Sequence, residues 1–302
     1  MTTPRIRLAR TLAQAADLFE NDMGKHEGQW LPGSPADQET ATEPLAGAWG
    51  DTPAHDAHVS VLLHVHAAAE NLRAVGVALE HSDAVIPLFT LARTVLDQSC
   101  YPWYQLEPGI GITQRILRHK NAELRSEHEK LLLLGGLATA DQGVIADAEE
   151  RIGAIFEGAG TQGWQCEPRK GINAPYIHTD RKNKKAPGTT ALAQEILPNG
   201  RLGTMAWRLG SAIAHGHSYG LASLLQTNGT NKGVVAQTDQ QTAQRLAAAP
   251  LSYVELLQRV YVDYGWSRQG LAQLKTNLSA VWAEVGRITP QAAHQVPATF
   301  RS

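Results

Sequence analysis

Cysteine is scarce in this chain, and so are long apolar runs. Cys100 and Cys166 are the two cysteines among 302 residues, and neither has a metal-binding spacing around it, which excludes a disulfide framework. The longest apolar runs, such as Leu131–Leu134, are too short to cross a bilayer. The N-terminus alternates arginines with apolar residues and forms no signal-peptide core. We therefore expect a cytoplasmic protein without a membrane segment.

Neither sign of charge is in excess. The chain has 27 Lys and Arg against 29 Asp and Glu, and its isoelectric point is near 6.6. Such a chain has no general attraction to nucleic acid or to anionic membranes, so anion binding would depend on a local patch. A glycine-rich phosphate loop after a strand, a serine nucleophile elbow and paired catalytic carboxylates are also missing. Nothing therefore matches the common motifs of nucleotide or ester hydrolysis.

Apolar residues recur at helical spacing over most of the chain. This pattern predicts an all-α fold, a multi-helix bundle with a partly basic, loop-rich insertion between the fifth and sixth helices. We expect helices at residues 4–22, 55–80, 82–106, 113–134, 139–155, 204–226 (interrupted at Gly216), 240–262 and 267–287, the fifth starting at a capping box formed by Thr139 and Gln142. The predicted core includes Leu62, Leu72, Leu88, Leu91, Val95, Leu117, Leu124, Ile152, Leu209, Ile213, Leu256 and Val260.

Changes in composition divide the chain into four segments. These are an N-terminal helix and long loop (1–54), a bundle core (55–157), a basic loop-rich insertion (158–203) and the C-terminal helices that complete the bundle (204–302). The loop of residues 23–53 is rich in Gly and Pro and long for a connection, which favours a lid or a wrapping arm. The insertion has room for a short hairpin and for a helix near residues 190–197.

The predicted helix of residues 113–134 is rich in charge. Arg115, His119 and Lys120 are among its ionisable residues, whereas Ile116 and Leu124 are placed to face the core. We expect the charged residues to form an exposed face of this helix.

An arginine and a histidine lie seven positions apart late in the chain. Arg208 and His215 would share one face of a helix, about 10 Å apart along its axis. A histidine titrates near neutral pH and can act as a general acid or base, while a guanidinium holds a phosphate and its negative charge. Ser211 and His217 would be their neighbours. The same residues also suit a plain helix end, where a histidine meets the dipole and the arginine is a surface residue.

The residues around this pair resemble those of a known family. The segment Trp207–His217, preceded by a helical hairpin around Leu91–Thr94 and Tyr101–Tyr104, resembles the HEPN superfamily of helical bundles, whose motif is an arginine and a histidine separated by four to six residues. The resemblance covers about residues 55–226. It implies a homodimer in which Arg208 and His215 of two protomers line one cleft and cleave RNA without metal. It also suggests a role as a toxin or in defence.

A second cluster is basic and lies in the insertion. Aromatic residues Trp164, Tyr176 and His178 are interleaved with its cations, a combination that suits single-stranded nucleic acid through phosphate neutralisation and base stacking. A solvated loop is the simpler interpretation. The cations are Arg169, Lys170, Arg181, Lys182, Lys184 and Lys185.

A third cluster contains histidines and glutamates at helical spacing. His66 and Glu70, and likewise His119 and Glu123, are four residues apart and could chelate a metal from one helix face. The Glu-x-x-His pattern of helical di-iron proteins does not occur in the chain. We therefore expect no metal and no cofactor, and a helical His/Glu metalloenzyme stays as an alternative.

RNA binding with metal-independent cleavage is the function that the pattern favours. The main alternative is a non-catalytic helical interaction or scaffold module. Leu209 favours this alternative, because many active HEPN members have a polar residue directly after the arginine, and so does the nearly neutral charge.

Overall fold

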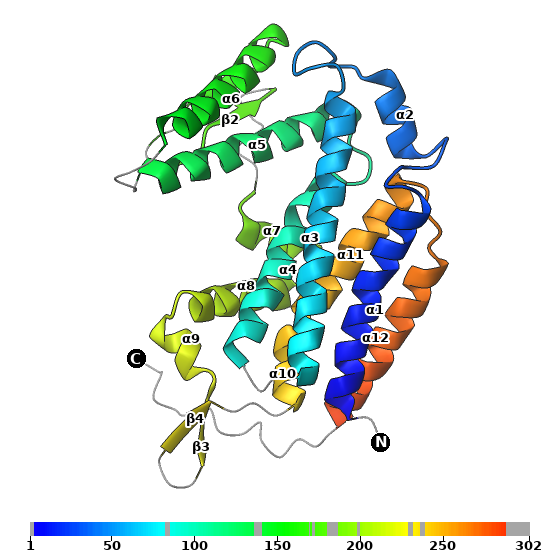
Figure 1. Ribbon diagram of the computed structural model, residues 1–302, viewed down its shortest axis with the longest axis vertical. Coiled ribbons are helices and arrows are strands. Elements are labelled where there is room, and N and C mark those ends of the chain that lie inside the picture. Colours follow the sequence, from blue (N-terminus) through cyan, green and yellow to red (C-terminus); the bar gives the residue numbers. More distant parts are fainter. Residues whose placement is uncertain are drawn as a thin grey trace.

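The computed structural model describes residues 3–81, 85–135, 141–168, 170, 173–179, 187–197, 200–228, 232–235 and 239–287. Most of these residues are helical, which confirms the predicted all-α, multi-helix bundle (Figure 1). The helices are α1 Pro4–Lys25, α2 Pro35–Thr42, α3 Pro53–His81, α4 Val85–Gln105, α5 Ile112–Gly135, α6 Gln142–Thr161, α7 Thr189–Ile196, α8 Gly200–Ala214, α9 Ser218–Ala222, α10 Asp239–Leu246, α11 Ala248–Asp263 and α12 Gln269–Arg287. The strands are β1 Gln165–Glu167, β2 Tyr176–His178, β3 Leu225–Asn228 and β4 Lys232–Val235.

The main core lies between α1, α3, α4, α11 and α12, which run side by side in Figure 1. On α1, Leu8, Leu12 and Phe19 recur on one face and are almost fully buried. Gly76 allows α3 to approach α1 closely, because a Cβ there would lie 2.8 Å from the carbonyl oxygen of Ala9. Nine of the predicted core residues are buried, and Leu91, Ile152 and Leu209 are partly buried against the apolar clusters.

Several helix bounds differ from the prediction. The helix expected at residues 204–226 is divided near Gly216, as predicted, into α8 and α9 but ends before β3, and the helix expected at 240–262 is split into α10 and α11. Two further differences concern helix starts and have a local cause. The helix expected from residue 139 begins at Gln142, because the Asp141 side chain accepts a hydrogen bond from the backbone N–H of Gly143 and acts as the N-cap. Within the loop of residues 23–53, α2 was not predicted. It begins after Ser34, whose hydroxyl accepts from the backbone N–H of Asp37, so a Ser-Pro start signal was present in a stretch that otherwise reads as irregular.

A second, smaller layer is formed by α5 and α6 with the short antiparallel pair β1–β2 (Figure 1). Leu117, Leu124 and Ile155 form its core. Trp49 anchors the loop after α2 onto this layer, since its ring lies 5.2 Å from that of Trp164 and its indole N–H donates to the Ile155 carbonyl. The β1–β2 pair agrees with the hairpin expected in the insertion.

The α7–α8 pair packs on α4. Two glycines of α8 lie where it contacts its neighbours. A Cβ at Gly203 would collide with the Ala193 carbonyl of α7, and a Cβ at Gly210 would collide with the Arg93 side chain of α4. Close packing through these glycines fixes which side of α8 faces the bundle.

No helix in the described part of the chain is both long and apolar enough to cross a membrane.

Candidate functional site

The predicted pair lies at the C-terminal end of α8. Arg208 is on the helix, and His215 follows its last residue, with its backbone N–H bonded to the Ser211 carbonyl at 3.0 Å. Gly216 then adopts a left-handed φ of 68°, and the His217 N–H donates to the Ala212 carbonyl at 2.8 Å. This is a glycine-terminated helix end, which explains why α8 stops at the histidine.

Arg208 and His215 are both exposed, while Ser211 is half-buried. Among the described residues, no salt bridge involves Arg208 or His215. Beyond the helix end, the rings of His215, His217 and Tyr219 follow one another with centroids 6.1 Å apart at each step. The structure therefore places a guanidinium, two imidazoles and a phenol on accessible surface at this end of α8.

Trp207, next to Arg208, anchors α8 to α4. Its indole N–H donates to Asp97 Oδ1 at 2.5 Å, and the Arg93 guanidinium lies over its ring and 3.4 Å from Asp97 Oδ2. Burial raises the pKa of Asp97, although Arg93 and Trp207 act in the opposite direction. Because successive helical residues differ by about 100°, anchoring Trp207 inward turns Arg208 outward.

The basic cluster is described at one position. Lys170 is exposed and bridges to Asn173 through the backbone, whereas Arg169, Arg181, Lys182, Lys184 and Lys185 lie outside the described residues. The aromatic neighbours pack inward: Trp164 contacts Trp49, and His178 is buried. Base stacking on these two rings is therefore not supported by their positions.

Charge is strongly segregated along the sequence around α8. Between residues 168 and 238 the chain holds nine Lys or Arg residues but two acidic residues, Asp180 and Glu195. That stretch carries a formal charge of +7, whereas the whole chain carries −2. From α8 through β4 there is no carboxylate side chain at all. A local attraction for anions thus coexists with a nearly neutral protein.

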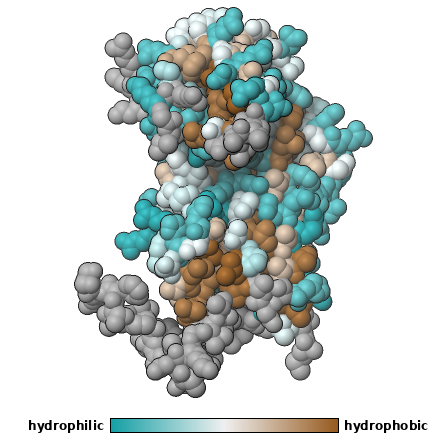
Figure 2. Space-filling view, turned by 60° about the vertical axis from the view of Figure 1, so that its left-hand side comes forward, coloured by the Kyte–Doolittle hydropathy of each residue, from teal (hydrophilic) through white to brown (hydrophobic). Residues whose placement is uncertain are grey.

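Figure 2 brings the side of α5, α6, α8 and α9 towards the reader. Hydrophilic side chains cross a hollow at mid-height, and apolar side chains gather below it. Met205 and Tyr219, from α8 and α9, are 68% and 60% exposed. Arg208 and these two large side chains are therefore all accessible around this part of the chain.

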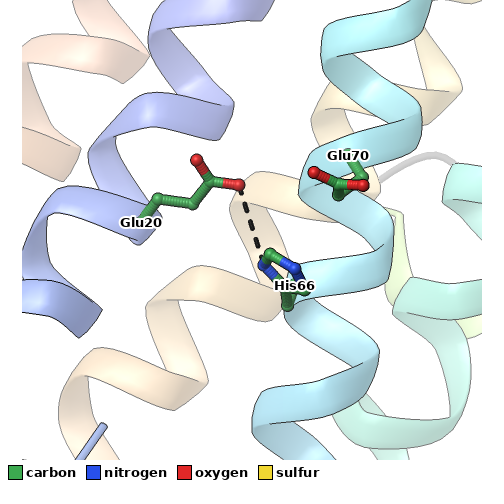
Figure 3. A group of neighbouring side chains, drawn as sticks. All are labelled: Glu20, His66 and Glu70. Atoms are coloured by element: carbon green, nitrogen blue, oxygen red, sulfur yellow. Dashed lines mark ion pairs between the residues drawn. The ribbon is translucent and has the colours of Figure 1, made fainter. Parts of the chain in front are cut away.

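The proposed metal ligands separate into two groups. His66 and Glu70 of α3 lie beside Glu20 of α1, with their ligand atoms within 4.8 Å of one another (Figure 3). The Arg73 guanidinium already binds both Glu20 oxygens, at 3.1 and 2.5 Å. A cation thus neutralises the carboxylate that would have to join the histidine.

The other two residues of that set lie on α5. His119 Nε2 is 3.6 Å from Glu123 Oε1, and burial lowers the pKa of His119 to about 4. Lys120 Nζ binds the second oxygen of Glu123 at 2.7 Å. Both proposed pairs are therefore engaged in ion pairs with side chains of the protein.

A buried charge network was not found by sequence reasoning. Arg115 of α5 binds Glu39 of α2 at 2.8 Å and Asp263 of α11 at 3.3 Å, and also donates to the Gln105 carbonyl. His58 of α3 is fully buried, with its ring nitrogens 2.9 Å from Glu39 and 3.5 Å from Asp263. Four helices therefore meet around two carboxylates, one guanidinium and one imidazole.

Burial and ion pairing have opposite effects on the two carboxylates. Burial tends to raise the pKa of Glu39, but the hydrogen bonds and charges of His58 and Arg115 together hold it below its usual value. For Asp263, burial is stronger than the attraction to Arg115 and His58, and its pKa is raised.

The prediction that the charged residues of α5 form an exposed face is wrong at three positions. Arg115, His119 and Lys120 are each 3–6% exposed. The reason is that α3 packs against α5 and that Arg115 binds carboxylates of α2 and α11, which helical periodicity within α5 cannot indicate. Asp263 carried a signal of its own, because it is a carboxylate in the apolar run Val260–Tyr264.

A cavity of about 590 Å³ lies beside this network. It is bounded by α2, the end of α4, the loop of residues 106–110, the start of α5, the end of α7 and α11. Glu39, Arg115 and Asp263 form part of its wall.

The cysteines are poor candidates for chemistry. Cys100 is fully buried, and burial, followed by the nearby Asp97 charge, raises the pKa of its thiol. Burial also raises the pKa of Cys166. Both groups are therefore protonated thiols at neutral pH, unlike an activated nucleophile.

Comparison with family models, curated proteins and solved structures found no match to this chain.

Proposed function

We propose that this protein is a HEPN-like RNA-binding protein, acting in the cytoplasm, in which Arg208 and His215 form a metal-independent ribonuclease site. The observation that carries the proposal is the exposure of both side chains on a stretch without carboxylates. From α8 to β4 the sequence supplies cations and imidazoles but no anion to repel a phosphate.

The reaction needs two kinds of group. The ribose 2′-oxygen attacks the neighbouring phosphorus and the bond to the 5′-oxygen breaks, leaving a cyclic phosphate and a 5′-hydroxyl. A base accepts the 2′-hydroxyl proton, and an acid returns a proton to the departing oxygen. The imidazole of His215 suits these roles. The Arg208 guanidinium would hold the phosphate and its growing negative charge.

The spacing of the two residues favours a shared site in a homodimer. Seven residues of helix place Arg208 and His215 about 10 Å apart along the axis, too far for both to contact one phosphate without long side-chain reach. A second protomer would supply the histidine to the arginine of the first. The exposed Met205 and Tyr219 side chains offer apolar surface for such an association.

The test is cleavage of labelled single-stranded RNA in EDTA by wild type, Arg208→Ala and His215→Ala. Arg268→Ala and His81→Ala are matched controls, because both residues are exposed and lie outside the stretch from α8 to β4. We expect both α8 variants to lose cleavage and the controls to keep it. Binding should weaken with salt in the wild type and less steeply in Arg208→Ala.

Other outcomes separate the alternatives. Salt-dependent binding without any cleavage would leave an RNA-binding module and reject the catalytic step. Absence of both from folded wild-type protein would reject the proposal and leave the helical interaction module.

A further inference from the structure

The cavity beside the buried charge network has no part in the proposed RNA site. Its volume of about 590 Å³ lies within the range of small-molecule sites. Much of its wall is apolar, which suits the body of an organic ligand. The apolar lining residues are Pro35, Trp103, Leu106, Pro108, Ile110, Ile196, Leu197 and Val262.

The charged part of the wall is mainly acidic. Five carboxylates line the cavity against two guanidinium groups, those of Arg115 and Arg259. Three of the carboxylates are already paired: Glu39 and Asp263 with Arg115, and Glu107 with Arg118 at 2.5 Å. Among the described residues, no salt bridge involves the other two, Glu195 and Glu255. No salt bridge of the described residues involves Arg259 either, so two carboxylates and one guanidinium of this wall lie outside salt bridges and their balance is negative.

Arg259 does not reverse this balance. Its guanidinium lies 3.5 Å from the centroid of the Trp103 ring and donates to the Trp103 carbonyl. Burial lowers the pKa of Arg259 to about 10, while Glu107, Glu255 and Glu195 act in the opposite direction. A ligand carboxylate drawn to Arg259 would meet these glutamates as like charges.

Two buried polar atoms on the wall also lack hydrogen bonds. Asp263 is 8% exposed, and its Oδ2 lies 3.5 Å from His58 Nδ1 but accepts no hydrogen bond from the described residues. The side-chain Nε2 of Gln258, a donor, likewise has no described partner; an ammonium offers it no acceptor, so this atom does not bear on the class of ligand. Buried polar groups without partners are uncommon in native proteins, and a bound ligand is one reason for them.

We propose that this cavity binds a small organic amine, with its ammonium group at the wall's carboxylates outside salt bridges, Glu195 and Glu255, and its apolar body against Ile196, Val262 and Trp103. An ammonium group offers three hydrogen-bond donors and no acceptor, which matches a wall with free carboxylates. The class of ligand thus follows from the sign of the unpaired charge and from the apolar lining.

The experiment compares ligands that differ in one terminal group. Tryptamine, tryptophol and indole-3-propionate share an indole body and carry an ammonium, a hydroxyl and a carboxylate respectively; hexylamine, hexanol and hexanoate form a second series. Binding to the full-length protein is measured by calorimetry. We expect the amines to bind about tenfold more tightly than the alcohols, and the acids least tightly.

Two variants locate the site. Glu255→Gln should reduce the preference for the amine about tenfold and leave alcohol binding nearly unchanged; Glu149→Gln on α6, which is exposed, is the matched control. Val262→Trp should weaken all ligands, because Val262 lines the cavity yet is 54% exposed, so a larger side chain there can fill the opening without disturbing the core.

The proposal is overturned if neither amine binds, if the three end groups bind equally, or if the acids bind best. It is also overturned if Glu255→Gln and Glu149→Gln behave alike. Because RNA cleavage is read separately, either proposal can fail alone.

Discussion

At the scale of single residues, Arg115 is the side chain on which the buried network depends. It is 4% exposed and neutralises Glu39 and Asp263, which are 17% and 12% exposed at their side chains. Removing a buried charge leaves its partners unpaired in a medium of low dielectric constant, which costs far more than the loss of a surface pair.

We therefore expect Arg115→Met to lower the free energy of unfolding by about 3 kcal/mol. Arg151→Met is the control, because Arg151 is 69% exposed and its partner Glu127 is also paired with Lys130, and its loss should cost less than about 1 kcal/mol. Urea denaturation followed by circular dichroism measures both. Equal effects of the two substitutions would show that the network contributes little.

His119 makes stability depend on pH. Burial lowers its pKa from 6.5 to about 4 despite the Glu123 and Asp56 charges, which act in the opposite direction, with Lys120 and His64 adding to the depression. The unfolded chain binds a proton near pH 6.5 and the folded protein does not, so this stability is present above pH 6.5 and is lost as the pH falls towards 4.

We expect His119→Gln to flatten the fall in stability between pH 6.5 and 4 by roughly 2–3 kcal/mol. The same substitution at the exposed His81 should leave the fall unchanged. Thermal or urea unfolding at several pH values gives the comparison. If the stability of His119→Gln falls with pH as steeply as that of the wild type, other groups cause the acid sensitivity.

At the scale of elements, glycines decide how closely helices approach. Gly76 lies in the interior of α3, where a Cβ would come within 2.8 Å of the α1 backbone at Ala9. Gly153 lies in the interior of α6, and a Cβ added there would have no other atom within 4 Å. The two positions therefore separate helix propensity from interhelical contact.

One substitution should have opposite effects at these positions. Gly153→Ala should stabilise the protein by about 0.5–1 kcal/mol, because alanine favours a helix, whereas Gly76→Ala should destabilise it by about 1–3 kcal/mol, because α1 and α3 must move apart. Melting temperatures measured side by side test this pair. Stabilisation by Gly76→Ala would mean that the α1–α3 contact relaxes freely.

At the scale of the whole molecule, the proposed ribonuclease site depends on two copies of the chain. If Arg208 of one protomer acts with His215 of the other, a mixed dimer of Arg208→Ala and His215→Ala contains one intact site and one doubly altered site. Each variant alone contains no intact site.

Refolding the two inactive variants together should restore roughly a quarter of wild-type cleavage. Half of the dimers are then mixed, and each mixed dimer has one working site of two. Light scattering on the same samples reports the dimer. A dimeric mixture with no restored activity would place both residues of a site on a single chain.

The helices followed from the sequence because their signal is local. Leu8, Leu12 and Phe19 repeat at helical spacing whatever packs against them, and Gly216 marks the end of α8. The exposure of Arg208 and His215 also agrees with their expected place near a helix end. The Ser34–Pro35 start of α2 was readable too, but eight helical residues within a long Gly- and Pro-rich loop gave too short a pattern to predict.

Contacts between distant segments were decided by the tertiary structure alone. Arg115 meets Glu39 across 76 positions and Asp263 across 148, and periodicity within one helix carries no information about which element will cover it. The same limit applies to the cavity, whose walls come from α2, α4, α5, α7 and α11. Sequence determined where the chain is helical and where its charge gathers, whereas packing decided which charges are buried together, because burial depends on every neighbouring element at once.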